Sequence, residues 1–298
     1  MLEFYKKLIV DIKFQPEDLK ILENQGLKLL TDYEDDIVNL IKLYKESGYD
    51  NKSFVDKREA LAEKSGCYVE LVTLVYLLCA CKDLKDRYME KGYTEEMFLS
   101  AAMDLKYKTG DCKKKQGVFG IAKDHDWHDA IYKMITIPLG RLQYQKQANW
   151  FDKSYTYKDI TINPGDDIYY IHIPESGPLT KELREESYKM AYEMLEKVDG
   201  KLYLACNSWL LCEQNPEMLG EDNNTVSFMR DFDVFDGFVR EADDNMWRIF
   251  GYDYDGKPEN LPRNTSMQKK VADWYMQGKH LGVGRGFLIL DENGRWNK

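Results

Sequence analysis

The chain has 298 residues, enough for two domains of ordinary size, and its 43% hydrophobic and 13% aromatic content is typical of a folded globular protein. Its formal net charge of −10 argues against a general nucleic-acid-binding protein, which needs a basic face to meet phosphates. The most apolar stretch, residues 69–81, is too short to span a bilayer, and the six cysteines lack zinc-site spacing, so we expect a cytoplasmic protein with free thiols and no membrane association.

The first third of the chain is expected to be helical. Pro16 suits the first position of a helix, and Thr94 followed by two glutamates is a typical helix start. Apolar spacing and glycine stops predict helices over residues 16–30, 35–44, 55–64, 68–91 and 94–107. The polar, basic, glycine-bearing segment 109–117 then predicts a loop or linker. We therefore place a helical domain at residues 1–115 and a second domain at residues 116–298.

The second part of the chain has a different pattern. A short helix is expected near residues 127–134, and the turn sequence at residues 163–166 predicts a hairpin between the two strand-like segments around it. Strands are predicted over residues 140–147, 155–162, 168–173, 201–211, 234–240, 246–252 and 283–290, with 234–240 paired to 246–252, and helices over residues 180–198, 223–232 and 264–278. Several antiparallel strands with single helices between them predict an α+β fold and not a doubly wound parallel sheet.

The segment Asp166–Lys197 is the most informative part of the sequence. A buried strand from Ile168 to Ile173 stops at a turn, Pro174–Pro178, and a helix begins near Thr180. The N–H groups at such a helix start, together with the helix dipole, favour an anion such as phosphate or pyrophosphate. An ordinary strand-to-helix connection with good capping is the alternative, because a single glycine in the turn is a weak signal.

The order of these elements resembles the GNAT (N-acyltransferase) fold. The segments that carry the resemblance are Leu139–Gln145 (LGRLQYQ), His172–Thr180 (HIPESGPLT), Cys206–Leu211 (CNSWLL), Asn223–Phe232 (NNTVSFMRDF) and Gly282–Phe287 (GVGRGF). They look like the GNAT-like C-terminal domain of bacterial acyltransferase-type proteins, in which this domain follows a helical N-terminal domain. The resemblance covers nearly the whole chain and implies a mostly antiparallel sheet with flanking helices.

The resemblance implies acetyl-CoA or another acyl-CoA as co-substrate and a small-molecule amine as acceptor. The pyrophosphate would lie on the turn Glu175–Thr180, and the pantetheine arm would lie where the strands 168–173 and 201–211 splay apart. The residues assigned to cofactor binding on this basis are Ile171, Ile173, Ser176, Gly177, Leu179, Thr180, Asn224 and Phe228.

Two residues of the turn depart from the family pattern. Glu175 carries a charge that would repel pyrophosphate, and Pro178 has no N–H to offer. The phosphate would then lie further along, near residues 179–181, or the CoA site is altered or lost. The helix with Phe228 also lacks the tyrosine that often serves as the acid in this family, because Phe228 and Phe232 have no hydroxyl.

Three side chains are candidates for catalysis by direct acyl transfer. His172 ends a buried strand beside the turn and is the candidate base, with a structural hydrogen bond as the alternative. Glu175 could act through a water molecule or bind the amine, or it is a solvated turn carboxylate. Ser208 could act as the acid for the leaving thiolate. Because Cys206 and Ser208 alternate on one strand, either could instead pair with His172 as a nucleophile, which would give a hydrolase.

The remaining signals are weaker. Arg141 and Arg285 begin strands beside glycines and could meet a phosphate or a carboxylate substrate, with surface ion pairs as the default. His125 and His128 lie three residues apart among aspartates, but an exposed helix start explains them and we predict no metal site. A non-catalytic acyl-CoA or small-ligand binding or sensor protein on a GNAT scaffold is the alternative to an enzyme.

Overall fold

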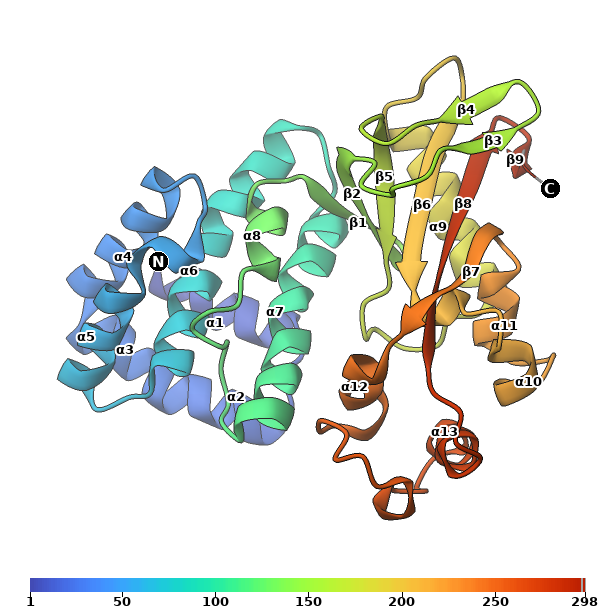
Figure 1. Ribbon diagram of the computed structural model, residues 1–298. Coiled ribbons are helices and arrows are strands. Elements are labelled where there is room, and N and C mark those ends of the chain that lie inside the picture. The colour runs from blue at the N-terminus through green and yellow to red at the C-terminus, as the bar shows by residue number, and fades with distance from the viewer. Residues whose placement is uncertain (296, 298) are drawn as a thin grey trace. The chain divides into compact units, whose positions relative to one another are not determined.

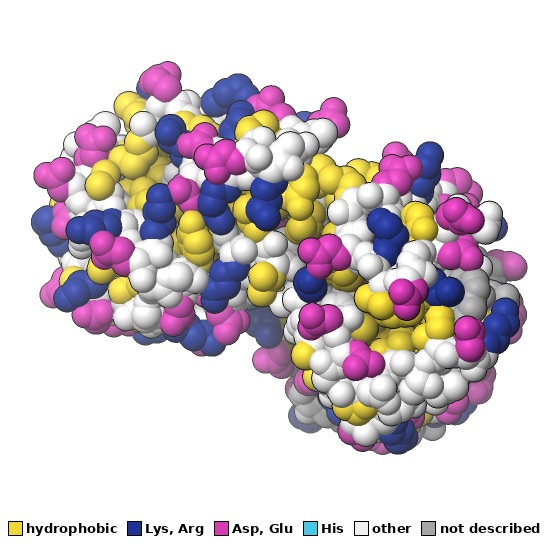
Figure 2. All heavy atoms as spheres, turned by 90° about the horizontal axis from the view of Figure 1, so that it is seen from above, with side chains coloured by type: hydrophobic (Ala, Val, Ile, Leu, Met, Phe, Trp, Pro, Cys, Tyr) yellow, Lys and Arg dark blue, Asp and Glu magenta, His cyan; other side chains and the backbone are white. Residues whose placement is uncertain are grey.

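The computed structural model describes residues 1–295 and residue 297, and the chain forms two compact units, residues 1–138 and 139–298 (Figure 1). No helix in these described residues is long and apolar enough to cross a membrane. In the view of Figure 2, Lys and Arg side chains are interspersed with Asp and Glu side chains over the surface.

The first unit consists of helices, as predicted. Its α-helices are α1 (Leu2–Asp11), α2 (Pro16–Ile21), α3 (Leu27–Asp32), α4 (Glu34–Glu46), α5 (Val55–Ser65), α6 (Val69–Glu90), α7 (Glu95–Gln116) and α8 (Trp127–Tyr132). A π-helical turn, Leu22–Gly26, joins α2 to α3. The eleven consecutive residues from Leu71 to Cys81 are all buried, so α6 is the central helix of this unit.

The linker predicted at residues 109–117 is wrong, because α7 continues to Gln116. Thr109 and Cys112 face the core with exposures of 2% and 3%, and the Lys113 ammonium forms an ion pair with Asp18. Tertiary contacts therefore outweigh the polar composition of this segment. The two units divide after Pro138, later in the chain than the boundary we predicted after Lys115.

The second unit contains a seven-stranded sheet with the order β1-β2-β5-β6-β8-β7, to which β9 adds beside β8. The first strand, β1 (Thr136–Leu139), contains the residue at which the two units divide. The strands that follow are β2 (Leu142–Ala148), β3 (Tyr155–Tyr157), β4 (Ile160–Ile162), β5 (Asp167–His172), β6 (Leu202–Ser208), β7 (Asp233–Glu241), β8 (Gly282–Asp291) and β9 (Gly294–Arg295). Of the registers that we describe, the β5–β6 pair is parallel and the others are antiparallel. This arrangement confirms the predicted α+β class.

Two strand predictions are wrong. The run 155–162 folds back on itself as the hairpin β3–β4, with Lys158 at a φ of 53° in its turn, and β5 pairs with β2 instead. The hairpin buries Tyr155 and Ile162 against Tyr170 and Phe287, on one face of the sheet. A hairpin signal within an eight-residue run is easily taken for one continuous strand.

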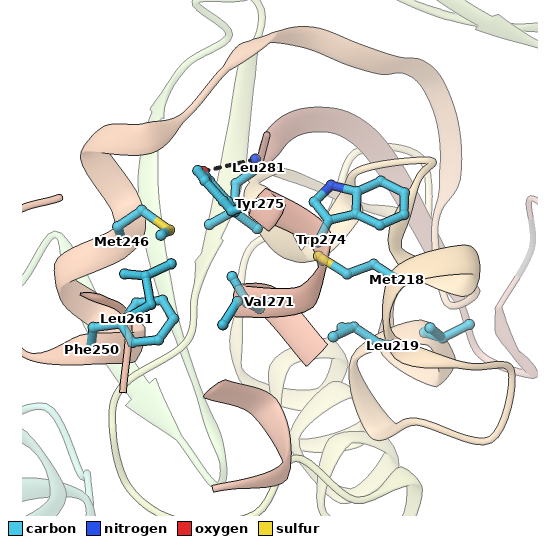
Figure 3. Packing of buried hydrophobic residues seen from close by; sticks show 11 residues of the cluster. Met218, Leu219, Met246, Phe250, Leu261, Val271, Trp274, Tyr275 and Leu281 are labelled. Atoms are coloured by element: carbon cyan, nitrogen blue, oxygen red, sulfur yellow. Dashed lines mark hydrogen bonds between the residues drawn. The ribbon is translucent and has the colours of Figure 1, made fainter. Parts of the chain in front are cut away.

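The second error is at residues 246–252, which form the helix α12 (Met246–Phe250), so that β7 pairs only with β8 among the strands whose registers are described. Met246 and Phe250 lie four residues apart and both enter an apolar cluster, and Gly251 ends the helix in the left-handed conformation. Figure 3 shows these side chains packed around Val271, Trp274 and Tyr275 of α13 (Ser266–Met276).

Helices cover the face of the sheet opposite the hairpin. α9 (Lys181–Met194) packs against β2, where the Tyr144 and Ser187 hydroxyl oxygens lie 2.9 Å apart, and α11 (Asn224–Met229) lies beside α9 (Figure 1). The short α10 (Asn215–Leu219) packs on α13. The strand β6 is followed directly by a 3₁₀ turn, η3 (Trp209–Leu211).

Three glycines of β8 allow neighbouring segments, η3 among them, to lie directly on the strand. A Cβ atom at Gly284 would lie 2.1 Å from the Leu211 carbonyl oxygen, and one at Gly286 would lie 2.9 Å from Phe232 Cβ. At Gly282 the obstacle would be the Phe238 ring, at 2.3 Å. The glycine-rich run of β8 is therefore a close-packing surface, and each alternate residue of it must lack a side chain.

We expect Gly284→Ala to lower the free energy of unfolding of the second unit by about 1–3 kcal/mol, because the obstructing atom is backbone and cannot rotate away. Gly110→Ala in α7 is the matched control, since its Cβ would meet no atom within 4 Å. That substitution should be neutral or stabilising by up to about 1 kcal/mol. Urea unfolding of both variants measures the difference, and equal midpoints would contradict the packing account.

Candidate functional site

The sheet opens between its two central strands. The parallel pairing of β5 with β6 comprises Tyr169 with Leu204 and Tyr170 with Ala205, and it ends there. On its other side β5 stays paired to β2 as far as His172, and β6 stays paired to β8 as far as Ser208. The carboxyl-terminal ends of β5 and β6 are therefore not paired with each other, and this is where we expected the two strands to splay apart.

The loop that follows β5 is held from within by Arg141. Its Nε, Nη1 and Nη2 atoms donate hydrogen bonds to the carbonyl oxygens of Pro178, Pro174 and Gly177, at 3.0, 2.9 and 2.9 Å. The side chain is largely buried, with 9% exposure of the residue. From the sequence we interpreted Arg141 as part of a surface ion pair or as a ligand contact. In the structure it instead binds three carbonyl oxygens of this loop and fixes its conformation.

A second buried guanidinium holds the end of the same loop. Arg184, in the first turn of α9, is fully buried and donates from Nη1 to the Leu179 carbonyl oxygen at 2.7 Å. Its Nε donates to the Asp231 carboxylate at 2.6 Å, and its Nη2 donates to the Ser227 hydroxyl at 3.0 Å. Asp231 is also paired with Arg295 at 2.8 Å. This network joins the loop and α9 to the end of α11.

The two guanidinium groups determine where the loop presents its N–H groups. In a trans peptide the N–H points opposite to the carbonyl that precedes it. Because the Pro178 and Leu179 carbonyls point at the guanidinium groups, the N–H groups of Leu179 and Thr180 point away from them. Among the described residues, the N–H groups of Gly177, Leu179, Thr180 and Lys181 have no protein acceptor.

The start of α9 is capped from its own first turn. The Thr180 hydroxyl accepts from the Leu183 N–H at 3.5 Å. The Glu182 carboxylate accepts from its own backbone N–H and from the Thr180 hydroxyl, and these bonds lower its pKa. An anion at the loop would therefore contact the N–H groups of residues 179–181 beside one competing carboxylate. This is the more distal of the phosphate positions that we considered for a turn with Glu175 and Pro178, and an altered or lost CoA site stays the alternative.

His172 lies on the opposite face of the sheet from Cys206 and Ser208. Tyr170 and Ala205 are register partners and share a face, so His172, two residues on, shares that face, whereas Cys206 and Ser208 point to the other. The nucleophile pairs that we considered, Cys206–His172 and Ser208–His172, are therefore wrong.

The three side chains have separate partners. His172 Nε2 lies 2.8 Å from Gln145 Oε1 of β2, and the Ser208 hydroxyl accepts from the Leu210 N–H at 3.2 Å as the cap of η3. Burial raises the pKa of the Cys206 thiol to about 12. A thiol of this kind holds almost no thiolate near neutral pH, so it is a poor nucleophile.

The other predicted site residues are distributed over the loop and α11. Glu175 and Ser176 are exposed in the turn, and Ile171 is buried in β5 while Ile173 is half-buried. Asn224 is exposed at the start of α11, where Asn223 is the residue that caps the helix.

Phe228 lies deeper than the resemblance implied. It is fully buried, with its ring 5.0 Å from that of Phe232 and beneath the Arg184 guanidinium at 5.9 Å. The structure thus places Phe228 in the packing between α9 and α11, under the loop and not on its surface.

In the Asp124–Asp129 segment, one histidine is hydrogen-bonded and the other is buried, and not at an exposed helix start as we expected. His125 Nδ1 accepts from the Trp127 N–H at 3.1 Å, and His128 is buried with 1% exposure. Asp129 accepts from the Tyr44 hydroxyl at 2.7 Å and from the Asn51 N–H at 3.0 Å. Within the described residues, no group of three or more His, Cys, Asp or Glu side chains could hold a metal ion.

Sequence reasoning missed Gln145, Arg184 and Asp231. Gln145 was read only as a polar residue of a strand, and its role follows from the register that brings it beside His172. Arg184 and Asp231 are charged residues in helical segments, where exposure is the usual outcome. The available signal was that Arg184 falls one turn after the cap Thr180, on the buried face with Tyr188.

Two family models together match nearly the whole chain. The model of the N-acyltransferase N-terminal domain matches residues 4–134, and the model of the GNAT-like C-terminal domain matches residues 136–288. No protein of curated function matches the chain.

Solved structures of similar fold include an acyltransferase in complex with decanoyl-CoA, at 19% identity and a TM-score of 0.67, and an acyltransferase in complex with decanoyl-CoA and teicoplanin, at 19% identity and a TM-score of 0.64. Each alignment covers 94% of this chain and 86% of the other. At this identity the likeness shows a shared fold.

The burial of Cys206 makes a prediction about reactivity. Because its pKa is raised to about 12, the thiol should resist alkylation of the native protein by iodoacetamide at pH 7.5, while the partly exposed Cys67 reacts. Peptide mass spectrometry after labelling gives the site of modification, and unfolding in urea should make Cys206 reactive. Rapid native labelling of Cys206 that is lost in His172→Ala would restore the nucleophile hypothesis.

Proposed function

Because the chain belongs to the family of GNAT-like acyltransferases, in which an N-acyltransferase N-terminal domain precedes a GNAT-like C-terminal domain, we propose that it transfers an acyl group from acyl-CoA directly to the amine of a small-molecule acceptor. The observation that carries the proposal is the opening between β5 and β6 with a loop of outward N–H groups at its end. Six free cysteines are compatible with a reducing, cytoplasmic location.

The loop fits a pyrophosphate in spite of its two unusual residues. The N–H groups of Leu179, Thr180 and Lys181 lie at the positive end of the α9 dipole, with the Arg141 and Arg184 guanidinium groups behind the peptide planes. The peptide between Gly177 and Pro178 has no N–H because Pro178 supplies its nitrogen. The carbonyl of this peptide belongs to Gly177 and accepts from Arg141. The loss is confined to that peptide and leaves the next two N–H groups in place.

The separated edges of β5 and β6 would hold the pantetheine arm. Backbone N–H and C=O groups that no longer pair across the two strands are suited to the amide groups of that arm. The arm would pass Ile171 of β5, which is buried, and Ile173, which directly follows the strand and is half-buried. A backbone N–H of the same strand would bind the thioester carbonyl oxygen and stabilise the oxyanion that develops on it.

His172 is the residue that we propose as the base. With Gln145 Oε1 accepting from Nε2–H, the basic lone pair of the imidazole lies on Nδ1. The amine nitrogen would attack the thioester carbon, a C–N bond would form and the C–S bond would break. The amine proton would pass to His172, and the thiolate would leave and be protonated to CoA thiol. Glu175 remains the candidate for binding the amine, whereas Ser208, which we expected as the acid for the thiolate, caps η3 on the opposite face of the sheet from His172.

The acceptor is proposed to be a small molecule. One protein of similar fold was solved in complex with decanoyl-CoA and teicoplanin, which supports a donor–acceptor pair of this general kind for the present chain. A binding protein that holds acyl-CoA without transfer is the second candidate. The exposed Glu175 carboxylate in the turn favours it, and acyl-CoA binding without turnover is its signature.

Two charge changes around the loop should move CoA affinity in opposite directions. Ser176→Glu adds a carboxylate beside the pyrophosphate and should weaken CoA binding roughly tenfold, about 1.4 kcal/mol. Glu182→Gln removes the carboxylate that competes for the helix start and should strengthen binding about two- to fivefold. Calorimetric titration with CoA and acetyl-CoA measures both.

The control for this pair is Glu193→Gln, which removes an exposed charge from the far end of α9. It should leave the dissociation constant unchanged. If wild-type protein binds neither ligand, or if all three variants bind alike, the pyrophosphate does not lie at this loop and the proposed function loses its basis.

The role of His172 can be separated from ligand binding. His172→Ala should lower kcat by about 100-fold or more, since the base is lost, while the dissociation constant for acyl-CoA stays the same. Thiol release from acetyl-CoA and octanoyl-CoA with a panel of primary amines measures the rate. His280→Gln, in a histidine bonded to Asp243, is the control and should retain activity. Unchanged turnover in His172→Ala would exclude this residue as the base.

A further inference from the structure

A row of polar side chains crosses the open face of the sheet where β5 and β6 separate. Gln143 of β2 is the register partner of His172, and Asn207 of β6 is the partner of Arg285 on β8. His172 and Asn207 each lie two residues past the Tyr170–Ala205 pair, so they stand level with each other. Asp236 of β7 continues the row beyond Arg285. Polar residues at one level of five neighbouring strands indicate a surface built to face a polar ligand.

The neighbouring level of the same face is apolar on the three central strands, between Gln145 of β2 and Asp233 of β7. Tyr170, Ala205 and Phe287 occupy it, and they pack beneath Phe151 and the β3–β4 hairpin. The polar row is therefore the border between a buried apolar cluster and the opening in the sheet. His172, our proposed base, lies at one side of this border, and Arg285 lies two strands away.

Arg285 is held in a position where it can receive an anion. Its guanidinium lies over the rings of Trp150 and Phe151, at 5.5 and 5.1 Å from their centroids, and its side chain is 14% exposed. The Nε atom is buried, and the described residues offer it no acceptor. One Nη atom pairs with the carboxylate of Asp152, whose side chain is 70% exposed. An exposed partner of this kind is readily exchanged for a ligand carboxylate, since such pairs contribute little stability.

Trp150 provides a rigid aromatic surface beside Arg285. Its ring is stacked on Tyr170 at 5.4 Å with an interplanar angle of 12°, and it meets Phe151 edge-on at 4.9 Å. Its backbone N–H donates to the Tyr170 hydroxyl at 3.2 Å. The residue is nevertheless 49% exposed. A tryptophan fixed in this way yet half open to solvent is suited to stacking with a flat ring of a ligand.

We propose that the acceptor is an amine that also carries a carboxylate and a flat ring, with the carboxylate bound by Arg285 and the ring on Trp150. This inference rests on the proposed acyl transfer and names the acceptor class for the same site. His172 of β5 and Arg285 of β8 lie two strand spacings apart, about 10 Å, on the same face and with Asn207 of β6 between them. An aromatic α-amino acid places its amine and carboxylate within that span.

Three probes that differ by one group test this proposal. L-phenylalanine carries amine, carboxylate and ring, phenethylamine lacks the carboxylate, and L-alanine lacks the ring. Calorimetric titration of each into the full chain saturated with CoA measures binding, and thiol release from acetyl-CoA measures transfer. We expect phenylalanine to bind about tenfold or more tightly than either of the other two, in keeping with a charge-assisted hydrogen bond.

Two substitutions at one ion pair should act in opposite directions. Arg285→Gln should abolish the preference for phenylalanine over phenethylamine, and Asp152→Asn should increase it by removing the competing carboxylate. Trp150→Ala should abolish the preference for phenylalanine over alanine while keeping the preference for a carboxylate. Because Asp152 is exposed, its variant will fold, so the test does not depend on the stability of the Arg285 variant.

The outcomes separate this inference from the proposed function. Absence of acyl-CoA binding removes the proposed function and this inference with it. If acyl-CoA binding is intact, three results would each overturn the acceptor class alone. The first is equal affinity for phenylalanine and phenethylamine, and the second is no detectable binding of either at about 10 mM. The third is an Asp152→Asn variant with the same preference for phenylalanine as the wild type.

Discussion

The shape of the loop after β5 depends on two guanidinium groups that bind its carbonyl oxygens. Arg141 binds three of these carbonyls and Arg184 binds a fourth. Arginine suits this task because its donors lie in one plane and its charge persists at any physiological pH. The geometry of the peptide bond converts inward carbonyls into outward N–H groups. Arg184 is itself held by Asp231, which extends the same constraint to α11 and β9.

The opening of the sheet has a counterpart in the glycines of β8. If β6 ended in a loop that left the sheet, its end would not fix the position of β8. Instead η3 turns across β8 directly after Ser208, and this approach is possible only because Gly284 presents no side chain to the Leu211 backbone. The end of β6 is thus fixed to β8 on one side, while on its other side it is free of β5. The close packing of η3 on β8 and the separation of β6 from β5 both follow from the position of the end of β6.

Local signals sufficed for the strand, turn and helix around the loop, because glycine, proline and threonine act on their own backbone there. They failed where distant contacts decide. Residues 109–116 are polar yet helical, since Thr109 and Cys112 are buried by contacts that no local pattern reveals. The relation of His172 to Cys206 depends on a one-residue register between parallel strands, and a sequence alone does not determine it. The burial of Arg184 likewise follows only from the position of Asp231 in the folded chain.

The division of side chains between the two faces of the sheet favours direct transfer over a covalent intermediate. The face that carries Cys206 and Ser208 is covered by α9, α11 and η3, and there one side chain is a buried thiol with a raised pKa while the other caps a turn. The opposite face carries His172, Asn207 and Arg285, whose side chains can donate or accept hydrogen bonds and include the base that we propose. Under the proposed function these groups would bind the amine, orient it and accept its proton, and the incoming amine itself would attack the thioester.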